Sequence, residues 1–282
     1  MRVGTRTSDL ARWQAEQVLA GLGRAGQPAR LVGVRTRGDR EHAPEALMAG
    51  EGAFVSALEE ALVRREIDLA VHSLKDVPVR LAEGLVLAAV LPRHDPSDAV
   101  VGRPLRALPS GARVGTSSPR RAAFVRALRP DLAVVPVRGN VPRRVALVER
   151  GEVEAVVLAL AGLERLGLGG LVAEVLPLDA FPPAPGQGAI AVEARQGEVP
   201  EAAVSLDDAP SRRAVEAERA LLARLGGGCG LPLGAWARPT AGGAIRLTAR
   251  LVDGQGRVRE AEAEAQAPEE VAEMAARALG RP

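Results

Sequence analysis

The chain of 282 residues carries a formal net charge of +2 and is 47% hydrophobic, which excludes disordered and fibrous proteins and allows two domains or three small ones. Only 2% of the residues are aromatic, so few rings are available for base stacking and a single-stranded nucleic-acid partner is disfavoured. The three histidines lie far apart and Cys229 is the one cysteine, so the sequence shows no spacing typical of a metal site.

The lack of long apolar segments in the sequence bears on the cellular location. It contains no run of 18 apolar residues and begins without an apolar signal segment, so we expect a cytoplasmic protein with no membrane partner. A single cysteine agrees with a reducing compartment.

Lysine and asparagine also occur only once each, at Lys75 and Asn140, and these rare residues mark positions where a functional role is worth considering.

Short apolar runs alternate with helical patterns up to about residue 190. The runs predict strands at 2–5, 29–34, 68–73, 85–91, 112–117, 132–137, 154–160 and 189–194. Apolar residues at helical spacing predict helices at 8–22, 53–66, 119–129 and 141–151. This alternation is typical of α/β proteins with largely parallel sheets.

A short internal repeat links two of these strand–helix junctions. "VGTRTS" (3–8) and "VGTSSP" (114–119) each end a strand and open a helix through hydroxyl residues. Ser8 or Asp9 can cap the first helix, and Ser118 can cap the second, with Pro119 at its first position. The repeat favours two similarly built α/β domains, with the proline-rich stretches 91–98 and 181–188 as candidate crossings between them.

The pattern changes after about residue 205. A long helix is predicted at 211–226, followed by strands at 231–239, 244–253 and 257–265 and a closing helix at 269–280. These elements predict a small α+β domain. Its glycine-rich loop "LGGGCGLP" (225–232) carries Cys229.

Arginines and hydroxyl residues gather just past several predicted strands. Helix N-termini attract anions, and arginines strengthen that attraction. One interpretation is a cleft that binds carboxylates or phosphates; the alternative is that arginine is simply abundant and these side chains are solvated. The residues concerned are Arg6, Ser8, Thr116, Ser117, Ser118, Arg120, Arg121, Arg138, Asn140, Arg143 and Arg144.

Two further positions carry reactive groups. In "AVHSLKDVP" (70–78), Lys75 and Asp76 follow a strand, where the carboxylate could be a general acid or base, an ammonium anchor, or part of a surface ion pair. Cys229 could be a buried filler, a nucleophile or the attachment point of a prosthetic group. The glycines on both sides argue against a filler, because they leave the thiol accessible.

Nine motifs in one order make the chain resemble the porphobilinogen deaminase family over nearly its whole length. They are "GTRTSDLARWQ", "TRGD", "FVSALEEAL", "DLAVHSLKDVP", "VGTSSPRR", "RGNV", "AGLERLG", "PGQGAI" and "AERALLARLGGGC". The resemblance implies a transferase of tetrapyrrole and heme biosynthesis. It would join four porphobilinogen molecules with release of ammonia and then release hydroxymethylbilane.

The resemblance also implies a covalent dipyrromethane cofactor, held by a thioether to Cys229, that primes the growing chain. Asp76 would be the catalytic carboxylate, assisting loss of ammonia, stabilising positive charge and moving the ring proton. Six linked pyrroles bring twelve carboxylates, and the residues implied to bind them are Arg6, Ser8, Lys75, Thr116, Ser117, Ser118, Arg120, Arg121, Arg138, Arg144 and Arg165. The same motifs extend this set to Gln14, Gly139, Asn140 and Gln187.

The implied fold is α/β, with two periplasmic-binding-protein-like domains of mixed, largely parallel sheet and a small C-terminal α+β domain. The first domain would combine 1–91 with 183–204, the second would span 92–182, and the third 205–282. The family also implies a monomer, and the lack of metal-ligand spacing among the histidines and the cysteine predicts that no metal is bound. The chain departs from the family pattern at Glu51, where lysine is usual, at Pro142, where glycine is common, and at Gly230, where a larger residue is usual.

A non-catalytic protein that captures a small anion in a similar two-domain cleft is the alternative. It would explain the arginines and the repeat. It would explain neither the Gly–Cys loop nor the third domain, so the enzyme is favoured.

Overall fold

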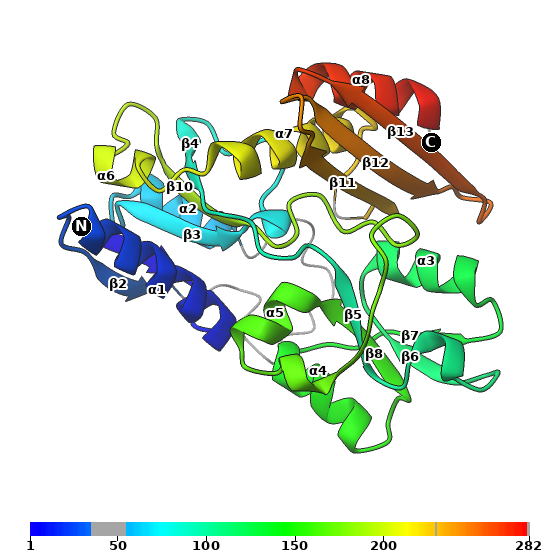
Figure 1. Cartoon of the computed structure of the whole chain (residues 1–282). Helices are drawn as coiled ribbons and strands as arrows, with labels where there is room; N and C mark the ends of the chain where they lie inside the picture. Colours follow the sequence, from blue (N-terminus) through cyan, green and yellow to red (C-terminus); the bar gives the residue numbers. More distant parts are fainter. Residues whose placement is uncertain (35–54, 229, 281–282) are drawn as a thin grey trace. The chain divides into compact units, whose positions relative to one another are not determined.

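The computed structural model describes residues 1–34, 55–228 and 230–280 (Figure 1). The chain divides into two compact units, Met1–Arg93 with Ala189–Arg212 and His94–Gly188 with Arg213–Pro282. Within the described ranges, no helix is both long and apolar enough to cross a membrane.

The first unit is built on a five-stranded sheet in the order β2-β1-β3-β10-β4. β1 pairs in parallel with β2 and β3, whereas β10 runs antiparallel between β3 and β4. β10, the last of these strands in the sequence, therefore lies between two strands that come much earlier in the chain. The strands are β1 (Arg2–Thr5), β2 (Arg30–Gly33), β3 (Leu69–Ser73), β4 (Leu85–Val90) and β10 (Ile190–Arg195).

Helices cover both faces of this sheet. α1 (Asp9–Arg24) lies along one face, where its Val18 packs in one apolar cluster with Val71 of β3 (Figure 1). α2 (Ser56–Val63) covers the other face, where its Leu62 clusters with Ala70. Successive strand residues point to opposite faces, so β3 is buried on both. A short helix, α6 (Glu201–Val204), follows β10.

The second unit contains a similar five-stranded sheet in the order β7-β6-β8-β5-β9. β6 is parallel to β7 and β8, and β5 is antiparallel to β8 and β9. The strands are β5 (Asp98–Gly102), β6 (Arg113–Gly115), β7 (Ala133–Val135), β8 (Ala155–Ala159) and β9 (Val172–Val175). The helices are α3 (Pro119–Leu128), α4 (Val141–Glu149) and α5 (Leu160–Arg165), with short 3₁₀ turns at Leu105–Ala107 and Gly169–Leu171.

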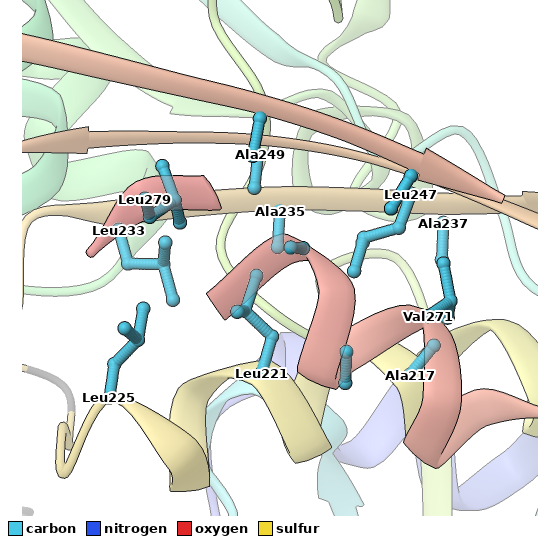
Figure 2. Packing of buried hydrophobic residues seen from close by; sticks show 14 of the residues in the cluster. Ala217, Leu221, Leu225, Leu233, Ala235, Ala237, Leu247, Ala249, Val271 and Leu279 are labelled. Atoms are coloured by element: carbon cyan, nitrogen blue, oxygen red, sulfur yellow. The ribbon is translucent and has the colours of Figure 1, made fainter. Parts of the chain in front are cut away.

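An antiparallel three-stranded sheet lies near the C-terminus. It consists of β11 (Leu233–Pro239), β12 (Ile245–Val252) and β13 (Val258–Ala265), between α7 (Ala209–Arg224) and α8 (Pro268–Leu279) in the sequence. Alternate residues of β12 are buried, so one face of the sheet is apolar. Figure 2 shows Leu221 of α7, Leu247 of β12 and Val271 of α8 in the core on that face.

This small sheet shares a core with the rest of the second unit. Val252, at the end of β12, belongs to the same buried cluster as Phe124 of α3 and Phe181. Gly234 of β11 lies so close to the 182 backbone that an added Cβ would stand 2.3 Å from the Pro182 carbonyl oxygen. Only glycine allows this approach.

The predicted fold class is confirmed, because two mixed α/β sheets are followed by a small α+β region. β5, β9, α5 and α6 were not predicted. β5 and β9 form the antiparallel pairs of the second sheet, and α5 and α6 are short helices of six and four residues. The division into three domains stays a prediction. Three predicted features, "TRGD" (36–39), Glu51 and Cys229, lie outside the described residues.

Candidate functional site

Lys75 and Asp76 lie in a single 3₁₀ turn, Leu74–Asp76, directly after β3. Leu74 is buried, and its backbone N–H donates to the Ala189 carbonyl oxygen at 3.0 Å. Val77 N–H closes the turn by donating to Leu74 O at 3.0 Å. The buried leucine thus anchors the turn, while Lys75 is half-buried and Asp76 is exposed. An exposed carboxylate on a fixed turn can exchange protons with a bound molecule.

Gln14 ties α1 to the strand end that precedes this turn. Its side chain is buried, and its amide Nε2 donates to the Ser73 hydroxyl at 2.8 Å. Ser73 is the last residue of β3, so Gln14 supports the position of Lys75 and Asp76. Direct binding of a ligand by Gln14 stays a prediction.

The start of α1 has the predicted cap. Ser8 is the N-cap, and its hydroxyl accepts from Ala11 N–H at 3.4 Å. Arg6 and Ser8 are both half-buried, close to the free N–H groups of the first turn. This arrangement suits an anion, and binding at either residue stays a prediction.

The repeat of this junction in the second unit is held by its own hydroxyls. Thr116 is buried and its Oγ1 accepts from Ser118 N–H at 3.2 Å, while the Ser117 hydroxyl donates to Val137 O. Ser118 caps α3 by accepting from Arg121 N–H at 3.4 Å. These three residues therefore shape the turn between β6 and α3, and their contact with a ligand stays a prediction.

A buried carboxylate, Asp98, binds the two arginines in the first turn of α3. Arg120 Nη2 donates to Oδ2 at 2.6 Å, and Arg121 Nε donates to Oδ1 at 2.9 Å. Gln187 Nε2 donates to Oδ1 at 2.9 Å as well. Burial alone would raise the pKa of Asp98, but the two arginines and the bond from Gln187 outweigh it and lower the pKa to about 2. One negative charge thus faces two buried positive charges, so the group keeps a net positive charge.

The two arginines have different surroundings. The Arg120 guanidinium lies 5.8 Å from the Phe124 ring centroid and 5.7 Å from that of Phe181, and its Nη1 donates to Pro182 O at 2.8 Å. Burial lowers its pKa, although Asp98 opposes that effect. Arg121 donates through its remaining nitrogens to Val157 O at 3.2 Å and Gln187 Oε1 at 3.2 Å. Both therefore have protein partners in this structure, and their binding of a ligand stays a prediction.

Asp98 was missed in the sequence. Its signal is a single acidic residue at the start of an apolar run, "DAVVG" (98–102), after the proline-rich "RHDP". A carboxylate at the buried end of a strand needs positive partners, and α3 supplies them.

The start of α4 presents the second arginine group. Asn140 caps the helix, with Oδ1 accepting from Arg143 N–H at 3.1 Å. Gly139 has a φ of +97°, a conformation that favours glycine, and Arg144 Nε donates to its carbonyl oxygen at 2.8 Å. Arg138, Gly139 and Asn140 are exposed and Arg144 is half-buried. The group is accessible to an anion, which stays a prediction.

Arg165 and Gln187 hold the "PGQG" turn (185–188). Arg165 Nη2 donates to Gly188 O at 2.6 Å, and Gln187 Nε2 donates to Pro96 O at 2.7 Å. Burial lowers the pKa of Arg165 to about 10, against the opposing charge of Glu164, so the side chain is still cationic at neutral pH. The structure thus groups Gln187 with Arg121 and Asp98.

Each unit therefore carries its own set of predicted residues. The first unit contains Arg6, Ser8, Gln14, Lys75 and Asp76, and the second contains the hydroxyl and arginine groups of α3 and α4 with Arg165 and Gln187. Among the residues with described positions, no cluster of three His, Cys, Asp or Glu side chains could hold a metal ion.

Relatives and family models match nearly the whole chain. Curated porphobilinogen deaminases are 46% identical in Thermobifida fusca (99% of this chain, 90% of that protein) and 50% identical in Nocardia farcinica (84% and 70%). A solved periplasmic substrate-binding protein from Coxiella burnetii aligns with 75% of the chain and 93% of its own, with a TM-score of 0.45 and 14% identity.

Two family models divide the sequence between them. The model described as "Porphobilinogen deaminase, dipyromethane cofactor binding domain" matches residues 1–201, and the one described as "Porphobilinogen deaminase, C-terminal domain" matches residues 212–280. The turn with Lys75 and Asp76 and the arginine-rich helix starts lie within the first of these matches. With both models in their expected order and relatives at 46–50% identity, the chain belongs to the porphobilinogen deaminase family.

Proposed function

We propose that the chain joins four porphobilinogen molecules onto a covalent dipyrromethane primer, releases ammonia at each addition, and frees hydroxymethylbilane by hydrolysis. The observation that carries this proposal is the pair of buried arginines, Arg120 and Arg121, that share the single carboxylate of Asp98. The positive charge left over suits the acetate and propionate groups of pyrroles. The alternative of a non-catalytic anion-binding protein is not favoured, because the matching families and relatives are named deaminases.

The donor set of the chain fits the cofactor. Arginines at the starts of two helices, with Ser118 and Asn140 as caps, provide N–H donors for several carboxylates. The dipyrromethane, when bound, supplies a free α-carbon to which the first porphobilinogen is joined. We propose Cys229 as its attachment point through a thioether.

Asp76 is proposed to move the protons of the reaction. Its exposed carboxylate can hold the ammonium group of porphobilinogen, so that the amine leaves as ammonia and the positive charge that develops on the pyrrole is stabilised. The same oxygen can then accept the proton that leaves the ring carbon after the new carbon–carbon bond has formed. Lys75, the neighbouring cation, is proposed to orient a substrate carboxylate.

The remaining predicted residues are proposed to bind or position carboxylates. Those at exposed or half-buried positions are proposed as direct ligands, and they are Arg6, Ser8, Ser117, Ser118, Arg138, Gly139, Asn140 and Arg144. The buried ones are proposed to bind or position carboxylates within their own units, and they are Gln14, Thr116, Arg120, Arg121, Arg165 and Gln187. We also propose the three-part division 1–91 with 183–204, 92–182 and 205–282, and a cytoplasmic monomer that needs no metal.

Intact mass tests the primer and turnover tests Asp76. The purified protein should exceed the mass of its sequence by two pyrrole units, whereas Cys229→Ala and Cys229→Ser should have the masses of their own sequences.

Asp76→Asn should keep the attached mass and lose turnover by about 100-fold or more. The matched control is Asp179→Asn, an exposed carboxylate elsewhere, which should turn over normally. Normal turnover by Asp76→Asn would remove that residue from the mechanism. A protein that gains no mass with porphobilinogen would contradict the proposed activity.

A further inference from the structure

A buried histidine and a buried glutamate meet inside the first unit. His72 Nε2 of β3 lies 3.1 Å from Glu193 Oε2 of β10, and their side chains are 4% and 0% exposed. His72 is opposite Ala191 and Glu193 is opposite Ala70, so the two are diagonal neighbours across the strand pair. They share the face of the sheet that α2 covers. None of the steps proposed above uses either residue.

Stability alone does not account for this pair. Glu193 Oε1 is buried and has no hydrogen-bond partner within the described ranges, so the carboxyl group is only half satisfied. A buried pair of polar or charged side chains is often no more stabilising than well-packed apolar side chains of similar volume. The surrounding cluster of Leu58, Leu62 and Ala70 shows that apolar residues pack readily on this face.

The location of the pair points to its role. His72 precedes the end of β3 by one residue and Asp76 by four. On the opposite face of the sheet, Ser73 is tied to Gln14, and the backbone of Leu74 is tied to Ala189 just before β10. The end of β3 is thus fixed through one face by Gln14, along its edge by the backbone, and through the other face by Glu193.

We propose that His72 and Glu193 are positioning residues for Asp76. Their contact fixes β3 against β10 at the last residues before the 3₁₀ turn, and the turn transmits that position to the carboxylate. The pair acts through the strand and touches no substrate. The inference rests on the proposed function, because it assumes that Asp76 moves protons during turnover.

The test replaces the pair by apolar side chains of similar volume. His72→Leu/Glu193→Leu should fold with a melting temperature close to that of the wild type, keep its attached mass and keep KM. Its kcat should fall by about 10- to 100-fold, because small displacements of a catalytic group reduce rates by that order. His72→Gln, whose Nε2 can donate to Glu193 from a similar place, should restore kcat to within about threefold of the wild type.

The matched control removes an ion pair at the other end of the same strand. Arg2 Nη2 and Asp68 Oδ1 are 2.7 Å apart beside the first residue of β3. Arg2→Leu/Asp68→Asn should change kcat little, because this ion pair lies at the start of β3, at the opposite end of the strand from the turn that carries Asp76. An equal loss of kcat in this control would show general sensitivity of the sheet and would overturn the assigned role.

The outcomes separate the inference from the function on which it rests. Wild-type kcat in a folded double variant overturns the inference. If Asp76→Asn is inactive in the same assay, the proposed function still stands. Wild-type kcat in Asp76→Asn overturns the inference together with the proposed role of Asp76, whereas the proposed activity is contradicted only by a protein that gains no mass with porphobilinogen. Where the double variant does not fold, Glu193→Leu decides, since a neutral imidazole is easier to bury alone than a carboxylate. Reduced kcat at unchanged KM in that variant supports the inference, and wild-type kcat overturns it.

Discussion

The carboxylate of Asp98 in β5 accepts a 2.6 Å hydrogen bond from Arg120 Nη2 in α3, and both side chains are buried. The contact joins a strand to a helix that begins 21 residues later in the sequence. It fixes the helix that carries the arginines of the predicted site.

Asp98→Asn should destabilise the protein by about 3–5 kcal/mol, because it leaves two buried guanidinium groups without a counter-charge. Urea denaturation at pH 7 measures the loss. The wild type should also weaken in acid: since the folded-state pKa of Asp98 is lowered to about 2, its stabilisation is present above pH 4 and is lost as pH falls toward 2. Asp131→Asn is the control, since Asp131 pairs with Arg129 at the surface and its loss should change the midpoint little. Equal effects of the two substitutions would contradict the prediction.

Ser118→Asp should separate capping from ligand binding. Aspartate is a good N-cap, so α3 should keep its stability, but the new negative charge should repel substrate carboxylates. We expect an unchanged melting temperature, with at least about a tenfold rise in KM or loss of the attached mass. Ala267→Asp adds the same charge at the start of α8, outside the predicted site, and should leave KM unchanged. Normal KM and normal attached mass in Ser118→Asp would exclude Ser118 from the anion site.

Glu59→Gln should stabilise the protein at neutral pH. Burial raises the pKa of Glu59, and the negative charge of Glu193 adds to the effect, while the bond from Ala82 N–H and the charge of His72 oppose it. A raised folded-state pKa means that the wild type loses stability as pH rises through that pKa. The gain of the glutamine variant should therefore stay below about 1 kcal/mol at pH 7, because Glu59 is half-exposed, and vanish near pH 4.

Melting temperatures of Glu59→Gln and wild type at pH 7 and pH 4 provide the measurement. The control is Glu60→Gln, whose side chain is 63% exposed and pairs with Arg64 at the surface. It should show little difference from the wild type at either pH. A destabilised Glu59→Gln at pH 7 would mean that the carboxylate makes a favourable contact that outweighs its burial.

Gly234→Ala should be strongly destabilising, because the added Cβ would stand 2.3 Å from Pro182 O and 2.9 Å from Phe124 Cε2. Overpacking of this kind costs about 1–3 kcal/mol. Gly242→Ala, where a Cβ meets no atom within 4 Å, should be neutral or slightly stabilising. Thermal unfolding of the two variants measures the difference. A stable Gly234→Ala would show that β11 can move away from the 182 backbone.

Local signals in the sequence predicted much of the fold. The start of α3 was predicted because Ser118 is a good N-cap and Pro119 suits the first helical position, and α4 because 141–151 carries apolar residues at helical spacing. α5 was missed since it follows β8 directly in one apolar run, "LALAGL" (158–163), with no turn residues between them.

The pairing of distant residues could not be predicted in the same way. Nothing near Asp98 indicates that its partners are Arg120 and Arg121, because that contact depends on the strand order of the sheet. The same holds for His72 and Glu193, which are 121 residues apart. Motifs in the sequence indicated the residue types of the site. The contacts by which these residues support one another could be seen only in the structure.

The late position of β10 in the chain has a consequence for synthesis on the ribosome. β4 pairs with β10 alone within its sheet, so it has no strand neighbour until Arg195 has been made. At about 5–20 residues per second, the interval between Val90 and Arg195 is roughly 5–20 s. During that time β3 and β4 each present an open edge, which exposes the nascent chain to non-native pairing and to chaperones. The support of Asp76 is therefore completed only after about two thirds of the protein has been translated.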